Sequence, residues 1–269
     1  MRGPLMQEWI VGHEPWLRVG AFAGVLLALL AAEELRPRRD NPRRRQRRVT
    51  NLAIVVVDVL AVRLLIPLGA TGTAIWADVQ GYGLFAHLAW APVLEAALAF
   101  LALDALIYWQ HRLFHRIPLF WRLHRMHHSD LEFGTTTGVR FHPVEILLSL
   151  LIKMGAVVAL GAPAVAVILF EIALNATSLF NHANLRLPLA LDAVLRRLIV
   201  TPDMHRVHHS VHREEHDSNY GFNLSCWDHL FRSYTGQPRD GHTTMRIGLE
   251  RFREAADQRL VRLLAQPLA

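Results

Sequence analysis

The chain has 269 residues, 52% of them hydrophobic, and its 29 basic and 23 acidic side chains leave a net charge of +6. A mean hydropathy of +0.21 is high for a soluble protein with so many charges, which favours a membrane protein. The single cysteine excludes a disulfide within the chain and a set of thiolate ligands for an iron–sulfur centre.

Three apolar stretches in the first half of the chain are long enough to cross a membrane as helices. They cover residues 16–33, 52–70 and 93–109, and Asp58 and Arg63 interrupt the second. The first stretch is expected to stay in the protein rather than be cleaved as a signal peptide, because the arginines follow it instead of preceding it.

The basic residues predict how these spans are oriented. Residues 36–48 contain eight arginines, whereas residues 67–93 contain none. By the positive-inside rule the arginine-rich loop is cytoplasmic and the second loop lies outside. The same run could instead indicate nucleic-acid binding, but its place between two apolar stretches favours membrane topology and contact with anionic lipids. No nucleic-acid partner is therefore expected.

Residues 143–175 are mostly apolar, with Gly161 and Pro163 near their middle. At 1.5 Å per residue each half would cover roughly 25 Å, which predicts a helical hairpin that enters and leaves by the same side. Lys153, the only lysine, would lie in the first leg and either snorkel or pair within the bundle. Counting spans then places every histidine group and the C-terminal region on the cytoplasmic side.

Eight histidines form three tight groups, in the segments HRLFH, HRMHH and HRVHH. In helices, spacings of three and four residues would place the members of a group on one face. Neutral imidazole binds iron, zinc and copper, and eight imidazoles exceed what one zinc ion takes. Carboxylates are scarce in these groups, which disfavours a glutamate-rich di-iron bundle. The pattern predicts an all-histidine site for two metals rather than unrelated surface or core histidines.

The same residues resemble the fatty acid hydroxylase and sterol desaturase superfamily of integral-membrane di-iron enzymes. The resemblance covers about residues 100–236, and it rests on HRLFH, an eight-residue gap, HRMHHSD, FHPVE, FNHANLRLP, TPDMHRVHHS and DSNYGFNLSCWDHLF. The short gap between the first two groups distinguishes this pattern from that of the acyl-chain desaturases, which usually space their histidine boxes more widely.

The resemblance implies an all-α polytopic membrane bundle, with a histidine-rich helical cap on the cytoplasmic side that holds two iron ions. It implies oxygen-dependent hydroxylation or desaturation of a lipid C–H bond, in a sterol, fatty acyl chain or related lipid. Carried over residue by residue, the expected ligands are His111, His115, His124, His127, His128, His182, His205, His208 and His209.

A single membrane domain over residues 1–269 is expected, with about three spans plus the hairpin. Its other parts are a first histidine region over 110–142, a second histidine region and cap over 176–236, and a C-terminal tail over 237–269. Because the chain has no flavin, haem or iron–sulfur signature, electrons would come from a separate reductase or ferredoxin-like protein. The lack of an organelle retention signal favours a bacterial inner membrane.

Four further residues are candidates for contacts around the ligands. Asp104 lies seven residues before His111, on the same helical face, where a carboxylate could hold a ligand histidine in its tautomer. His142 could donate to the site or cap a helix beside Pro143. His212 and His216 continue the spacing of the third group and could extend it.

Two other functions fit parts of the sequence. A zinc-dependent membrane hydrolase would need a carboxylate as general base beside the ligands, as in HExxH, and the sequence has no such motif. A non-catalytic membrane protein that binds metal or lipid would keep the histidines without the oxidation chemistry.

Overall fold

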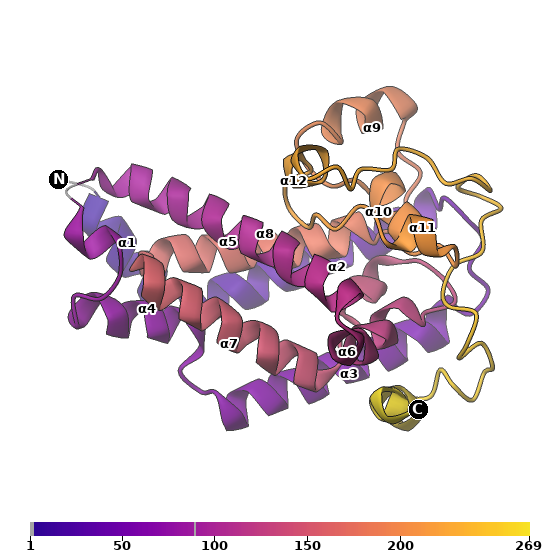
Figure 1. Ribbon diagram of the computed structural model, residues 1–269, viewed down its shortest axis with the longest axis horizontal. Coiled ribbons are helices and arrows are strands. Elements are labelled where there is room, and N and C mark those ends of the chain that lie inside the picture. The colour runs from indigo at the N-terminus through magenta and orange to yellow at the C-terminus, as the bar shows by residue number, and fades with distance from the viewer. Residues whose placement is uncertain (1–2, 89) are drawn as a thin grey trace.

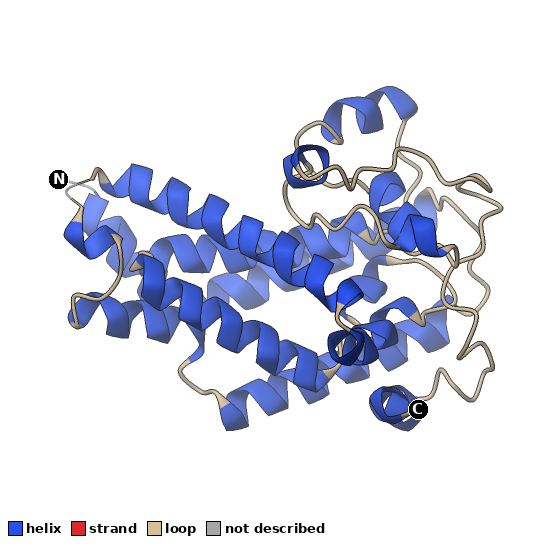
Figure 2. Cartoon of the chain, in the orientation of Figure 1, coloured by secondary structure: helices blue, strands red, loops and turns tan. Residues whose placement is uncertain are grey.

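The computed structural model describes residues 3–88 and 90–269, and its regular structure is helical. Within those ranges the chain forms no β-strand, only three isolated bridges between loops (Figure 2). The all-α fold expected from the sequence is therefore confirmed.

Five segments are long and apolar enough to cross a membrane, which marks the chain as a membrane protein and confirms the expected three spans plus a hairpin. Prolines stand at the starts of several of these helices, where the missing N–H costs nothing. The segments are α2 (Glu14–Leu35), α3 (Arg44–Leu65) continued by α4 (Gly69–Val79), α5 (Pro92–Arg116), α7 (Pro143–Leu160) and α8 (Ala164–Asn181).

The second span differs from the range 52–70 that its hydropathy predicts. Helix α3 begins within the arginine run at Arg44 and ends at Leu65, and the chain then bends before α4. Pro67 accounts for the bend, because the residue before a proline is driven out of the α region, and Ile66 has φ −135° and ψ 63°. Helix α4 packs against α7 and α8.

Helices α7 and α8 form the hairpin expected from residues 143–175. Gly161 ends α7 in the left-handed conformation, with φ +66°, and Pro163 precedes the first residue of α8. The loop before α5 covers this turn, because Leu84 donates from its backbone N–H to the carbonyl of Ala159 at 3.0 Å. Helix α8 continues to Asn181 and so delivers the next residues to the opposite end of the bundle.

Lys153 pairs within the bundle rather than snorkelling. Its ammonium group contacts the carboxylate of Glu171 on α8, and Arg18 on α2 contacts the same carboxylate. The two cations and the carboxylate are largely shielded from solvent, as unpaired charges in a membrane span would be costly. The contact ties α2, α7 and α8 together.

Short helices gather at one end of the bundle, and α1 (Gly3–Gly12) and α4 lie at the other (Figure 1). The arginine-rich loop belongs to the end with the short helices, since Arg38 contacts Asp203 on α10 and Arg47 contacts Asp130 just after α6. The short helices are α6 (Pro118–His128), α9 (Leu189–Leu195), α10 (Pro202–His208), α11 (Arg213–His216) and α12 (Cys226–Leu230).

The remaining helical segments are short and connect or buttress the others. The tail contacts the end of α6, where Gln266 donates to the hydroxyl of Ser129 at 3.0 Å. These segments are η1 (Phe85–His87), η2 (Thr135–Val139), α13 (Leu260–Ala265) and η3 (Gln266–Leu268).

Candidate metal centre

All nine histidines expected as ligands are buried and meet in two adjacent clusters. In each cluster the candidate ligand atoms lie within 4.8 Å of one another. The five-histidine cluster comprises His111, His115, His124, His128 and His208, and the four-histidine cluster comprises His127, His182, His205 and His209.

The helices split each HxxHH segment between the two clusters. In α6, His124 and His128 lie one turn apart and join the five-histidine cluster, whereas His127 joins the other. At the end of α10, His208 likewise joins the five-histidine cluster and His209 the four-histidine cluster. Successive helical residues are rotated by about 100°, so adjacent histidines diverge. The expectation that each group presents one shared face holds for His111 and His115 on α5, but it is wrong for the other two groups, which contribute to both clusters.

Protein oxygens set the protonation of three imidazoles in the five-histidine cluster. A carbonyl oxygen or the oxygen of an ionised carboxylate can only accept, so the Nδ1 atom donates to it and the Nε2 atom of a neutral ring is left bare. The acceptors are the Tyr220 carbonyl for His111 at 2.8 Å, the Glu145 carboxylate for His124 at 2.7 Å, and the Ser218 carbonyl for His208 at 2.6 Å.

These bare nitrogens face one another. The Nε2 atom of His111 lies 3.1 Å from that of His124 and 3.0 Å from that of His208. Since none of the three Nε2 atoms carries a proton, the contacts are not hydrogen bonds but opposed lone pairs. A cation between them would remove the repulsion.

The four-histidine cluster converges on His182. Its Nδ1 atom donates to the Ser178 carbonyl at 2.8 Å, and its Nε2 atom lies 3.1 Å from the Nε2 atoms of His127, His205 and His209. One lone pair cannot accept from three donors, so hydrogen bonding does not account for this arrangement.

The buried imidazoles are held in the neutral form that binds metal. Burial lowers the pKa of His124 and that of His182 to about 3 each, and it lowers the pKa values of His127, His128 and His209 well below the ordinary range. At neutral pH neither cluster carries the positive charge that would repel a metal ion.

The spacing of the nitrogens fits ligands around one ion in each cluster. Two nitrogens that each lie about 2.1 Å from an ion, at right angles to each other, are about 3.0 Å apart. The Nε2 atoms facing one another in both clusters are separated by 3.0 to 3.1 Å. Both ring nitrogens of His115 also lack a hydrogen-bond partner in the described part of the chain. The donor set therefore fits two metal ions.

Aromatic rings separate the clusters from the apolar core of the bundle. The ring of Phe141 stacks on His127, with centroids 4.5 Å apart and planes 8° apart. Phe222 lies 5.1 Å from His111 and 5.8 Å from His205 between ring centroids, and it also belongs to the core formed by α5, α7 and α8. The histidines thus border an apolar interior rather than water.

Asp104 and His212 do not contact either cluster, and His142 takes the second of its two expected roles, that of a helix cap. Asp104 accepts hydrogen bonds from Leu224 N and the indole of Trp227, so it supports the loop before α12 instead of a histidine. His142 caps α7, since its Nδ1 atom accepts from Val144 N at 3.2 Å. His212 pairs with Asp240 at 2.7 Å, in a solvent-exposed contact.

His216 lies beside the five-histidine cluster, and it forms a possible metal-holding group with His115 and Asp217. Asp217 places a carboxylate oxygen 3.4 Å from the Nδ1 atom of His115. The sequence reasoning missed Asp217 and Glu145, although both lie in segments that carry the family resemblance. The sequence signal for Glu145 is an acidic residue in the first turn of a strongly apolar helix.

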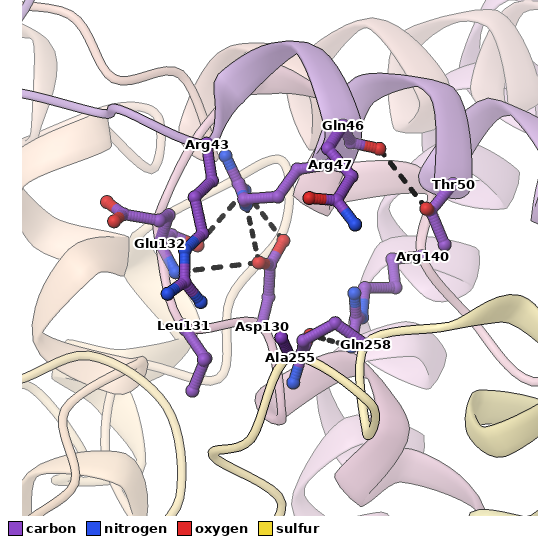
Figure 3. Close-up of a pocket in the computed structure, with 10 residues that line it drawn as sticks. All are labelled: Arg43, Gln46, Arg47, Thr50, Asp130, Leu131, Glu132, Arg140, Ala255 and Gln258. Atoms are coloured by element: carbon purple, nitrogen blue, oxygen red, sulfur yellow. Dashed lines mark hydrogen bonds and ion pairs between the residues drawn. The ribbon is translucent and has the colours of Figure 1, made fainter.

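The pocket drawn in Figure 3 is not the place where a lipid would react. It lies beside the Arg47–Asp130 pair, between α3 and the tail, and none of its lining residues is a histidine. Its volume of about 30 Å³ suits a water molecule rather than an acyl chain.

Comparisons with known proteins agree with these features. The family model described as fatty acid hydroxylase matches residues 96–233, about half of the chain, and this range includes all nine histidines. No solved structure matches the chain.

Several curated relatives share this region. The chain is 31% identical over 159 residues to ornithine lipid hydroxylase OlsE of Rhizobium tropici, covering 59% of this chain and 47% of that protein. It is 28% identical over 163 residues to human alkylglycerol monooxygenase, covering 59% of this chain and 34% of that protein. A very-long-chain aldehyde decarbonylase, GL1-5 of Oryza sativa subsp. indica, is 29% identical over 163 residues, with coverages of 57% and 24%.

The match spans less than half the length of each of these relatives. The matched region nonetheless contains both histidine clusters and the helices that hold them, from α5 to α12. On this evidence the chain belongs to the fatty acid hydroxylase family.

Proposed function

We propose that the two histidine clusters hold two iron ions and that the protein is an oxygen-dependent oxidoreductase acting on a lipid C–H bond. The observation that carries the proposal is the convergence of Nε2 atoms, at 3.0 to 3.1 Å, in both clusters, which hydrogen bonding does not account for. Imidazole ligands suit iron, zinc or copper, and membership of the fatty acid hydroxylase family supports iron among these.

When bound, the irons would supply the reduction of dioxygen and the oxidation of an unactivated C–H bond. The residues of the chain orient the ligands and keep water out. Carbonyls of Tyr220 and Ser218 hold the rings of His111 and His208 with their Nε2 atoms turned inward. Phe141 and Phe222 close the side that faces the bundle, where excluding water would limit side reactions.

A lipid is the proposed substrate because the apolar core of the bundle leads up to the clusters. Phe222 contacts this core together with Leu103, Ile107 and Phe170. A C–H bond held on the core side of Phe222 would be next to the histidines. Two of the relatives are named for the hydroxylation of ornithine lipid and the monooxygenation of alkylglycerol, which supports hydroxylation and a polar membrane lipid.

The electrons are proposed to come from a separate reductase or ferredoxin-like protein on the cytoplasmic side of a bacterial inner membrane. The arginine-rich loop lies at the same end of the bundle as the clusters, which supports this orientation. An acidic electron donor would be attracted to that end.

The only cysteine provides a test of the orientation. Cys226 is exposed on α12, at the end of the bundle that carries the clusters. A membrane-impermeant maleimide should label Cys226 in inverted membrane vesicles and leave it unlabelled in intact spheroplasts. The reverse labelling would place the clusters outside.

The function is tested by metal analysis followed by turnover. Detergent-purified protein from iron-supplemented cells should contain about two irons per chain and should consume dioxygen when given reductant and lipid. Lipid extracts incubated with it should gain one oxygen atom by mass spectrometry. Zinc together with lipid hydrolysis would favour the hydrolase instead, and bound metal without turnover would favour a non-catalytic protein.

A further inference from the structure

We propose that Glu145 is a positioning residue that makes the five-histidine cluster the tighter of the two metal sites. This inference rests on the proposed metal centre and concerns the order in which its two sites fill. It predicts that the five-histidine cluster binds the first metal ion and the four-histidine cluster the second.

Glu145 is fixed where it can orient His124. It lies in the first turn of α7, is only 5% exposed, and its Oε1 atom accepts the Nδ1 proton of His124 at 2.7 Å. Pro143 occupies the first turn and His142 caps it, and the Nε2 atom of His142 is in turn 3.1 Å from the Leu264 carbonyl. The helix start that carries Glu145 is therefore anchored on two sides.

The hydrogen bond acts on the metal-facing side of the ring. With Nδ1 donating to Glu145, the Nε2 atom of His124 points at the Nε2 atom of His111 with its lone pair free. A carboxylate is a stronger acceptor than a carbonyl and makes the ligand nitrogen more basic. Asp217 adds a second carboxylate to this cluster, 3.4 Å from the Nδ1 atom of His115.

The four-histidine cluster lacks this support within residues 3–88 and 90–269. The Nδ1 atom of His182 donates to a backbone carbonyl, and the Nδ1 atoms of His127, His205 and His209 have no hydrogen-bond partner there. Its ligands are consequently less firmly oriented, and a metal ion there has to order them when it binds. The difference between the clusters therefore predicts unequal affinities.

Asp104 provides a matched control. It is also a buried carboxylate in an apolar helix, 1% exposed, but its Oδ2 atom accepts from Leu224 N at 3.2 Å and from the Trp227 indole at 2.8 Å. Changing either residue to its amide makes the same nearly isosteric replacement in the same bundle. Only the change at Glu145 alters a histidine contact.

The experiment is a calorimetric titration of Zn²⁺ into metal-free, full-length protein in detergent. The wild type should take up two ions in two steps. Glu145→Gln should weaken the tighter step about 10- to 100-fold, because loss of such a partner typically costs that much metal affinity. Asp104→Asn should leave both steps unchanged. His208→Ala should remove the tighter step, and His205→Ala the weaker one.

The possible results separate this inference from the proposed function. If Glu145→Gln leaves the tighter step unchanged, or weakens only the step that His205→Ala removes, the role of Glu145 is wrong although the metal centre stands. If the wild type takes up no metal, the metal centre itself is wrong. Should Glu145→Gln fail to remain monodisperse in detergent, Glu145→Asp keeps the charge but withdraws it by one methylene, and it should show the same selective loss.

Discussion

Arg47 donates two hydrogen bonds of 2.6 Å to the carboxylate of Asp130, across 83 residues of sequence. Figure 3 shows this pair. Both side chains are buried, and Thr137 also donates to Asp130 at 2.9 Å. Burial alone would raise the pKa of Asp130, but Arg47 and Arg140 outweigh it and hold that pKa well below its usual range. The pair connects α3 to the turn directly after α6, the helix that carries three of the histidines.

Arg47→Met should destabilise the protein strongly, because it leaves the charge of Asp130 buried without its main partner. Removing one member of a buried ion pair typically costs about 3–5 kcal/mol. The midpoint of thermal unfolding in detergent should fall by several degrees, and the metal content should fall as α6 loosens.

Arg44→Ala is the matched control for this change. Arg44 stands one turn earlier on α3 and pairs with Glu34 at 3.0 Å in an exposed contact, and such pairs contribute about 0–1 kcal/mol. Equal melting temperatures for the Arg47 and Arg44 variants would contradict a special role for the buried pair.

His208→Ala and His127→Ala should each abolish turnover while leaving insertion into the membrane intact, since they remove one ligand from the five-histidine and four-histidine clusters respectively. Iron measured by mass spectrometry should drop in both variants. His212→Ala should retain iron and activity, because His212 pairs with Asp240 in a solvent-exposed contact outside both clusters. Full turnover in either cluster variant would exclude the proposed ligand set.

Gly138→Ala should disturb the four-histidine cluster without altering any ligand. A Cβ atom at this position would lie 2.3 Å from the Ser178 carbonyl oxygen and 3.1 Å from the Nδ1 atom of His182. These two atoms form a hydrogen bond with each other. Overpacking of this kind costs about 1–3 kcal/mol. The weaker step of the Zn²⁺ titration should be reduced, whereas Gly155→Ala, where the new Cβ meets nothing within 4 Å, should leave both steps unchanged.

The metal-free protein should lose stability as the pH falls below about 6.5, the ordinary pKa of histidine. Burial lowers the pKa of His124 and that of His182 to about 3 each in the folded state. Between these pH values the unfolded chain therefore binds protons that the folded chain does not, and the free energy of unfolding decreases by up to about 1.4 kcal/mol per pH unit for each such histidine.

Melting temperatures of the metal-free protein, measured from pH 8 to pH 5, test this dependence. They should be nearly constant above pH 7.5 and should decline steadily below pH 6.5. A melting temperature that rises on acidification would mean that the imidazoles are charged in the folded protein.

Much of the architecture follows from the local pattern of residues. Hydropathy over about twenty residues predicts a spanning helix wherever it occurs, so the spans, the hairpin and its turn at Gly161 could be inferred directly. The helical spacing of the three histidine groups likewise pointed to a metal site. The end of α3 at Leu65 was missed because hydropathy continues through Pro67, whereas the backbone does not.

The sequence by itself determined that the protein is an all-helical membrane protein and that its three histidine groups meet, and the family resemblance added His182 to them. Only the tertiary structure decided how they divide into five and four, that Glu145 rather than Asp104 contacts a cluster histidine, and that Arg47 reaches Asp130. The physical reason is the separation along the chain over which each effect acts. Hydropathy and helical periodicity act within one segment, whereas a hydrogen bond between residues far apart in the chain depends on the rotation and depth at which separate helices pack.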